Sequence, residues 1–337
     1  MTTVWRPSSG CGPHCLPGNG EAPAVPAVRQ LGRAAGLLGM LGLGIGLAAL
    51  LPVLPARERQ AALRGWARST ARACGVRLEV RGRLPRRRAL LVANHVSWWD
   101  ILALLAVAPA RLTAKQEVRR WPLIGLLARS AGTVFVDRSR PRELPATVGR
   151  VASALRSGRS VAVFPEGTTW CGAAASCRPP TGFRPAMFQA AIDAGAPVVP
   201  LRIAYRCGVT GETTTAPAFV GDETLLRSVR RMLQVRRLTV CVDIAAPLHP
   251  GRSADRRALA RVAESAVHLV PSSPAVPPAP VVVEPGPVQP VRVPARPTAG
   301  PAVLPVPTRS PAALLPAGVS GGAASTGEPE RKLPLAA

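Results

Sequence analysis

The sequence predicts an α/β domain with a mixed, largely parallel sheet flanked by helices, preceded by a membrane-attached helical element. The domain is indicated by strand-like apolar runs that alternate with helical patterns from Val76 to about Leu269. No internal repeat of fixed period appears beside them. The N-terminal element is indicated by residues 34–56, which carry no charge and consist mostly of Leu, Ala and Gly.

The charge of the chain favours a polyanionic partner. Its 337 residues are 47% hydrophobic, which is enough for a sizeable core, and their formal net charge of +25 comes almost wholly from arginine. Anionic membrane lipids and nucleic acid both fit this excess. Aromatic residues make up only 4% of the chain, whereas sites for single-stranded nucleic acid use aromatic stacking platforms. We therefore expect anionic membrane lipids as partners and no nucleic acid.

The N-terminal region divides into a leader and an anchor. Residues 1–28 are rich in Pro, Gly and Ser and predict a flexible leader. Residues 29–75 predict a membrane anchor, because the apolar segment 34–56 is long enough as a helix to span a bilayer, and no A-x-A cleavage site precedes Arg57. Five glycines and Pro52 leave a re-entrant or interfacial hairpin open beside a spanning helix.

The stretch after the apolar segment is strongly basic. Its arginines recur at helical spacing, which is typical of a helix in the headgroup layer and also of an ordinary amphipathic surface helix. Because this stretch directly follows the apolar segment, we favour the membrane. The positive charge then places the downstream domain on the cytoplasmic side of the cell membrane. The arginines are Arg57, Arg64, Arg68 and Arg72.

The α/β domain is expected to occupy residues 76–270. Beyond Pro271 the composition changes to Pro, Ala and Val, so residues 271–337 predict a disordered tail without a fold of its own. The expected strands are 76–80, 89–93, 133–136, 160–164, 197–203 and 238–244, and the expected helices are 98–108, 117–131, 141–157, 185–195, 223–233 and 253–269.

The seven cysteines are interpreted as incidental thiols in a reducing compartment. Their number is odd, and they are too sparse for a disulfide scaffold. Cys11 and Cys15, like Cys171 and Cys177, lack the C-x-x-C spacing of known zinc sites, and no second ligand pair is obvious. We therefore expect no metal.

One histidine occupies a position suited to proton transfer. The run from Leu90 to Asp100 passes from a buried strand into a helix, so His95 lies at the carboxyl end of the strand, where open α/β sheets bind ligands. Asp100, in the first helical turn, can hold one imidazole nitrogen and leave the other to take a proton from an alcohol. In the alternative interpretation Asp100 only caps the helix, with Ser97 in an approximate capping box.

Three further blocks lie at strands of the predicted sheet. Arg138 ends one of them and is either a phosphate ligand or the ion-pair partner of Asp137. A proline-bounded apolar run, P-V-V-P, suits either the core or the wall of an acyl groove. The remaining block follows a buried strand with a glycine turn whose backbone and hydroxyl donors suit a phosphate or a glycerol hydroxyl; its residues are Glu166, Gly167 and Thr168.

Together these blocks resemble a known family. Four blocks follow one another over about 105 residues: N-H-x4-D, G-x-V-F-V-D-R, V-F-P-E-G-T and P-V-V-P. Their order resembles that of the lysophosphatidic acid acyltransferases (1-acylglycerol-3-phosphate O-acyltransferases), which are glycerolipid acyltransferases. The resemblance covers roughly residues 60–270. It implies the glycerolipid acyltransferase fold with a membrane-attached N-terminus, His95 as general base and Asp100 as the residue that orients it.

The acceptor site implied by the resemblance departs from the family pattern at one position. Where the family usually has Arg after Glu-Gly-Thr, this chain has Thr169, so one phosphate ligand is missing. Arg178 or Arg184 could substitute, or the acceptor could carry a different headgroup. The ligands that the resemblance implies for the acceptor's phosphate and glycerol are Arg138, Glu166 and Gly167.

The expected function is acyl transfer in phospholipid biosynthesis. The acyl group would pass from acyl-CoA or acyl carrier protein, with no other cofactor, to the sn-2 hydroxyl of 1-acylglycerol 3-phosphate, giving phosphatidic acid. One alternative keeps the chemistry but takes another lysolipid acceptor, such as lyso-ornithine lipid. A second alternative is a basic membrane-tethered protein that binds lipid or nucleic acid without catalysis.

Overall fold

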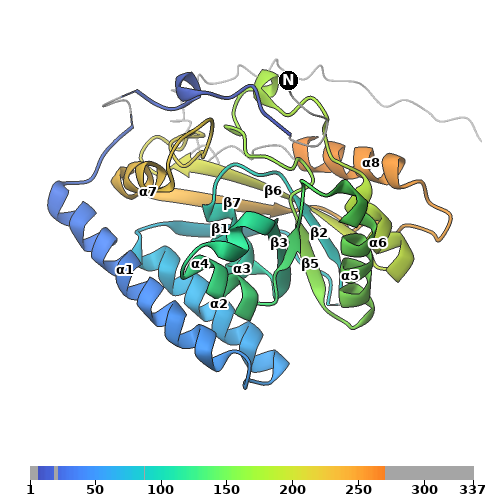
Figure 1. Ribbon diagram of the computed structural model, residues 1–337. Coiled ribbons are helices and arrows are strands. Elements are labelled where there is room, and N and C mark those ends of the chain that lie inside the picture. Colours follow the sequence, from blue (N-terminus) through green and yellow to red (C-terminus); the bar gives the residue numbers. More distant parts are fainter. Residues whose placement is uncertain (1–6, 19–21, 87, 270–337) are drawn as a thin grey trace, which may run out of the picture. The chain divides into compact units, whose positions relative to one another are not determined.

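A seven-stranded sheet forms the centre of the domain. The computed structural model describes residues 7–18, 22–86 and 88–269, and its strands follow the order β1-β7-β6-β2-β5-β3-β4 (Figure 1). β6 and β7 pair antiparallel, and all other neighbours pair parallel, which confirms the expected mixed, largely parallel sheet. The strands are β1 Arg77–Arg81, β2 Leu90–Ala93, β3 Ala110–Lys115, β4 Val134–Val136, β5 Ser160–Val163, β6 Val198–Cys207 and β7 Leu238–Ile244.

Helices cover both faces of the sheet, which explains why the central strands are almost uninterrupted apolar runs. In β2, Leu91 and Ala93 belong to one hydrophobic core, while Leu90 and Val92 belong to the other. Residues of α2, α3 and α7 contribute to the first core, and residues of α5, α6 and α8 to the second. These helices are α2 Ala56–Ala73, α3 Trp99–Val107, α5 Leu144–Arg156, α6 Ala186–Ala194, α7 Leu225–Gln234 and α8 Arg256–Leu269.

Two expectations about the elements were wrong. Strand β3 was missed, because its sequence Ala-Arg-Leu-Thr-Ala-Lys contains two charges and only Leu112 is buried. The helix expected at 117–131 is instead a 3-10 turn, η2 Gln116–Arg120, followed by α4 Ile124–Ser130. Pro122 and the positive φ of Leu123 lie at the break. The tail expected at 271–337 lies outside the described residues.

The predicted anchor forms a helical hairpin. α1 runs from Ala27 to Leu50, a turn follows, and α2 returns beside it. By length and composition α1 is apolar enough to cross a membrane, and only 11% of its most apolar window is buried. It contacts α4 and α7 of the domain, and the Arg33 guanidinium on α1 donates to Leu233 O and Val235 O, both at 2.8 Å. Within the hairpin, the Trp66 indole N–H of α2 donates to Met40 O of α1 at 2.8 Å.

Glycines permit the close approach of α1 to α2. A Cβ added at Gly36 would lie 3.2 Å from Ala73, and one added at Gly44 would lie 3.0 Å from the Trp66 ring. Gly42 and Gly46, also on α1, lie outside this contact, because a Cβ added at either position would meet nothing within 4 Å.

Alanine substitutions at two α1 glycines test the hairpin. Gly46→Ala should raise stability by roughly 0.5–1 kcal/mol, because alanine favours the helix and space is open there. Gly44→Ala should lower stability, since overlap with Trp66 costs roughly 1–3 kcal/mol and exceeds that gain. Thermal unfolding of the detergent-solubilised protein measures both. Equal stabilisation by the two variants would contradict the packing of α1 on Trp66.

Candidate active site

The carboxyl end of β2 is fixed to its neighbour β6 by a buried amide. The Asn94 side chain donates to Ile203 O at 2.9 Å, and the Ile203 N–H donates to the Asn94 carbonyl oxygen at 2.7 Å. This two-way bond replaces the strand pairing that ends at Ala93. The residue that follows, His95, therefore leaves the sheet from a fixed point.

Asp100 holds the imidazole of His95 from the first turn of α3. Asp100 Oδ2 lies 2.8 Å from His95 Nδ1, and the Asp100 side chain is fully buried. The same oxygen accepts the N–H groups of Val96 at 2.7 Å and Ser97 at 2.9 Å. Asp100 therefore binds the backbone at the start of the helix and orients the histidine at once, so the two interpretations of this residue are compatible.

A tyrosine completes the surroundings of the Asp100 carboxylate. The Tyr205 hydroxyl, on β6, donates to Asp100 Oδ1. Burial, followed by the charge of Asp100, raises the pKa of Tyr205 well above its ordinary value, so the phenol stays protonated and remains a donor. Each oxygen of the buried carboxylate thus has at least one hydrogen-bond donor.

The His95 ring is packed on one face and available at one nitrogen. It stacks on Phe164 with ring centroids 3.9 Å apart and planes 13° apart, and its side chain is 19% exposed. In the tautomer that donates from Nδ1 to Asp100, Nε2 is the acceptor nitrogen, and within the described residues it has no hydrogen-bond partner. Nε2 can therefore accept a proton from a bound hydroxyl.

Glu166 is enclosed by the protein. One carboxylate oxygen accepts the His95 N–H at 2.7 Å, and the other accepts the Trp170 indole N–H at 2.9 Å. Burial raises the pKa of Glu166 to about 8, with the charges of Asp100 and Glu264 adding to the effect. The resemblance implied that Glu166 binds the acceptor, and that role stays a prediction; in the structure the residue is 1% exposed and its carboxylate is held by these two contacts.

Basic side chains gather at the turn after β5. Arg138 Nη1 donates to Gly167 O, and Gly167 adopts a φ of 74° that favours glycine. Burial and then the charge of Arg184 lower the pKa of Arg138, while burial and the charge of Arg138 lower the pKa of Lys115. The alternative ion pair of Arg138 with Asp137 is absent among the described residues, where Asp137 pairs with Arg140 at 3.6 Å. Positive charge therefore gathers at the turn after β5.

The N-terminal leader and the loop after β5 close this side of the site. The Trp170 N–H donates to His95 O at 3.0 Å, and the Ser9 hydroxyl donates to Thr169 O at 3.0 Å. Thr169, at the position where the family has arginine, donates its hydroxyl to Phe219 O. Residues 7–18 of the leader, expected to be flexible, are thus placed against this loop.

The comparisons with known proteins agree with this geometry. Residues 76–204 match the Acyltransferase family model. The lyso-ornithine lipid O-acyltransferase of Pseudomonas aeruginosa is 38% identical over 72% of this chain and 93% of its own length. The chain belongs to this acyltransferase family. The 1-acyl-sn-glycerol-3-phosphate acyltransferase of Neisseria gonorrhoeae is 36% identical over 54% of this chain and 68% of its own length.

A solved structure shares the fold of this acyltransferase. The 1-acyl-sn-glycerophosphate (LPA) acyltransferase PlsC of Thermotoga maritima superposes with a TM-score of 0.51 at 21% identity, covering 72% of this chain and 95% of that chain. The expected family and fold class are therefore confirmed. The alternative of a non-catalytic binding protein is set aside, because the family and its matched relatives are acyltransferases.

The acyltransferase site contains both predicted and unpredicted residues. Sequence reasoning placed His95 and Asp100 together, and the structure joins them directly. Thr168 lies partly exposed beside Gly167. Reasoning from the sequence missed Tyr205 and Trp170, since neither belongs to a motif. The one available signal for Tyr205 was that a chain of 337 residues contains a single tyrosine, within an apolar strand.

Removal of the Tyr205 hydroxyl should slow catalysis through Asp100. In Tyr205→Phe, Asp100 Oδ1 loses a donor, which should cost roughly 1–3 kcal/mol of stability. We expect kcat to fall about 10–100-fold with KM for the lysolipid unchanged, because Tyr205 acts on Asp100 and not on the acceptor. Steady-state kinetics and thermal unfolding measure these effects. A raised KM at unchanged kcat would instead place Tyr205 in acceptor binding.

Glu166 should make the protein less stable as pH rises. Its folded pKa of about 8 lies above the ordinary 4.5, so the folded state binds more protons than the unfolded state between these values, and stability falls with increasing pH. His268, whose Nε2 lies 3.8 Å from Glu166, has a pKa lowered to about 4 and acts oppositely below pH 6.5. Between pH 6.5 and 8 the Glu166 effect should dominate.

Unfolding measured across pH 6.5–8 tests this effect. The wild type should lose on the order of 1–2 kcal/mol over this range, and Glu166→Gln, which cannot ionise, should show a flatter profile. Parallel profiles for the two proteins would show that Glu166 is already ionised at pH 6.5.

Proposed function

We propose that this acyltransferase transfers a fatty acyl group from acyl-CoA or acyl carrier protein to the sn-2 hydroxyl of 1-acylglycerol 3-phosphate, forming phosphatidic acid. The observation that carries the proposal is the His95–Asp100 pair, with Nδ1 held at 2.8 Å and Nε2 free of protein partners within the described residues. Such a pair deprotonates an alcohol without a serine or cysteine nucleophile.

In the proposed reaction, His95 Nε2 takes the proton of the acceptor hydroxyl as its oxygen attacks the thioester carbonyl. The imidazolium that forms is stabilised by the buried Asp100 carboxylate. When the tetrahedral intermediate collapses, the C–S bond breaks and the imidazolium protonates the leaving thiolate. The C–O bond formed is the new ester, and His95 returns to its neutral state.

The acceptor's headgroup is proposed to bind at the cations near Gly167. Lys115, Arg138 and Arg184 interact electrostatically there, so a phosphate would relieve their mutual repulsion. Arg184 follows Phe183 and donates its N–H to Pro165 O, which places it beside the same turn. It is the candidate to replace the arginine that is missing at Thr169. Arg178 is directed elsewhere, with its guanidinium 5.9 Å from the Trp170 ring centre.

Lyso-ornithine lipid is the second candidate acceptor. Two observations favour it: the Thr169 hydroxyl is used by Phe219 O and adds no positive charge, and the Pseudomonas aeruginosa relative carries that name. The carboxylate of an ornithine headgroup would need fewer cations than a phosphate. The same His95 chemistry serves either acceptor.

We further propose that α1 and α4 embed in the surface of the cell membrane from its cytoplasmic side. α1 exposes Leu31, Leu38 and Leu43. Because α1 contacts α4 and α7 of the domain and Arg33 bonds Leu233 O and Val235 O, it fits a helix lying in the interface rather than one spanning the bilayer.

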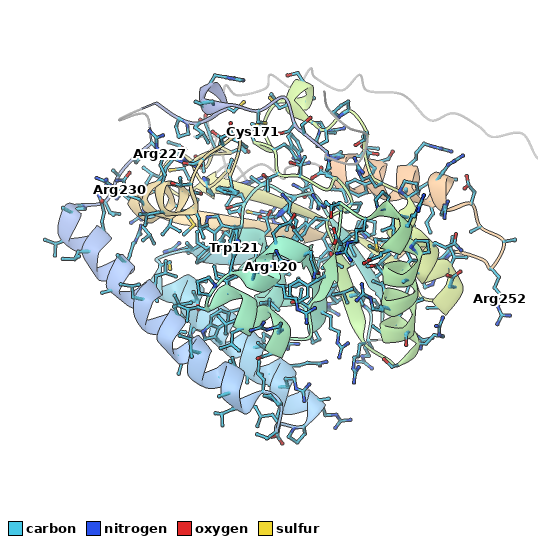
Figure 2. The ribbon with its side chains drawn as sticks, viewed as in Figure 1. Arg120, Trp121, Cys171, Arg227, Arg230 and Arg252 are labelled. Carbon is cyan, nitrogen blue, oxygen red and sulfur yellow. The ribbon has the colours of Figure 1, made fainter. Side chains whose placement is uncertain are left out.

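Neighbouring residues suit the headgroup layer. Figure 2 shows Trp121 beside Arg120 before α4, and Trp121 is 43% exposed. Arg227 and Arg230 are exposed on α7, which contacts α1 (Figure 2). These arginines would rest on anionic lipid and hold the site at the depth of its amphiphilic acceptor.

Substitution of His95 tests the reaction. His95→Ala should lower acyl transfer by at least about 1,000-fold, because the general base is lost, while membrane association stays intact. The measurement is transfer from a labelled acyl thioester in membranes containing the protein. The matched control is His249→Ala, which removes an exposed histidine and should leave the rate unchanged. Retention of most activity in His95→Ala would exclude His95 as the base.

The same assay with two acceptors identifies the substrate. Phosphatidic acid formed from lysophosphatidic acid, with little product from lyso-ornithine lipid, supports the first candidate, and the reverse supports the second. Transfer to neither acceptor would contradict the proposed function.

A further inference from the structure

Four cysteines from two distant parts of the sequence lie close together in the structure, next to the candidate active site. Cys11 and Cys15 come from the leader, around the 3-10 turn η1 Pro13–Cys15, and Cys171 and Cys177 come from the loop after β5. All four Sγ atoms lie within 4.8 Å of one another, and Cys15 Sγ is 3.6 Å from Cys177 Sγ. In Figure 2 Cys171 is labelled where this loop passes the leader.

The spacing of the sulfur atoms suits a tetrahedral zinc ion. Zn–S bonds of roughly 2.3 Å in a tetrahedron place the sulfur atoms about 3.8 Å apart, so the cluster needs only a small contraction around the ion. One backbone donor also points to the cluster, since the Cys171 N–H lies 3.1 Å from Cys11 Sγ.

We propose that Cys11, Cys15, Cys171 and Cys177 bind one Zn²⁺ as a structural site. Four thiolates fill the tetrahedral coordination and leave no open position for a substrate, so the ion would hold the chain together and take no part in the reaction. The expectation of incidental thiols rested on the spacing within each pair. Both pairs were considered separately, and nothing in the sequence indicated that they meet, because 162 residues separate Cys15 from Cys177.

The zinc ion would fix the loop that shapes the active site. Cys171 directly follows Trp170, which bonds both His95 O and Glu166. On the other side of the cluster, the leader places Ser9 on Thr169 and Pro7 next to Gly167, where an added Cβ would lie 2.9 Å from the proline ring. The ion would join these two segments.

Metal analysis of the full-length protein tests the proposal. The protein is purified in detergent under reducing conditions, and its zinc is measured by inductively coupled plasma mass spectrometry. We expect about one zinc per chain in the wild type and a loss of at least about five-fold in Cys15→Ser and Cys177→Ser. The matched controls are Cys74→Ser and Cys241→Ser, since these thiols are buried outside the cluster and should leave the zinc content unchanged.

Cobalt provides a test that does not depend on the folding of a variant. Protein produced with Co²⁺ should show the intense visible bands and the sulfur-to-metal charge transfer of a tetrahedral tetrathiolate. Wild-type protein that carries less than about 0.1 metal ion per chain under both conditions would overturn the proposal. So would the same zinc content in Cys15→Ser as in the wild type, or peptide mapping that finds these cysteines joined as disulfides in freshly lysed cells.

Discussion

The buried carboxylate of Asp100 is the interaction on which the site depends. A charge without solvent must be satisfied by the protein, and here the donors come from His95, Val96, Ser97 and Tyr205. These groups belong to the loop after β2 and to strand β6, and Asp100 itself lies in the first turn of α3, so one carboxylate joins three parts of the fold. Nδ1 of the His95 ring is held at Asp100 as a result.

The parallel sheet brings the remaining groups to the same place. β2, β3, β4 and β5 run parallel, so their carboxyl ends lie at one edge. His95 follows β2, Glu166 follows β5, and Arg138 follows β4. The proposed base and the proposed anion site thus follow strands of one sheet. The loop after β5 is longer than its neighbours, and the leader lies against it at Ser9.

The membrane hairpin and the domain are connected by packing rather than by a linker. α2 contributes Ala67 and Ala71 to the first core, and α1 lies along it through Gly36 and Gly44. Because α2 leads directly into β1, the proposed depth of α1 in the lipid would set the depth of the sheet. An amphiphilic lysolipid would therefore meet His95 without leaving the membrane surface.

The sequence alone determined much of this. Its alternating apolar runs predicted the strands and helices, except where charges hid β3 and Pro122 broke a helix. The pairing of His95 with Asp100 was also predictable, because residues five positions apart at the start of a helix lie close together. Only the tertiary structure placed Tyr205 on Asp100, enclosed Glu166, and gathered Cys11, Cys15, Cys171 and Cys177. These contacts join residues that are dozens to over a hundred positions apart in the sequence. A local pattern of apolar residues predicts a strand or a helix, but it does not say which distant segments come into contact when the sheet forms.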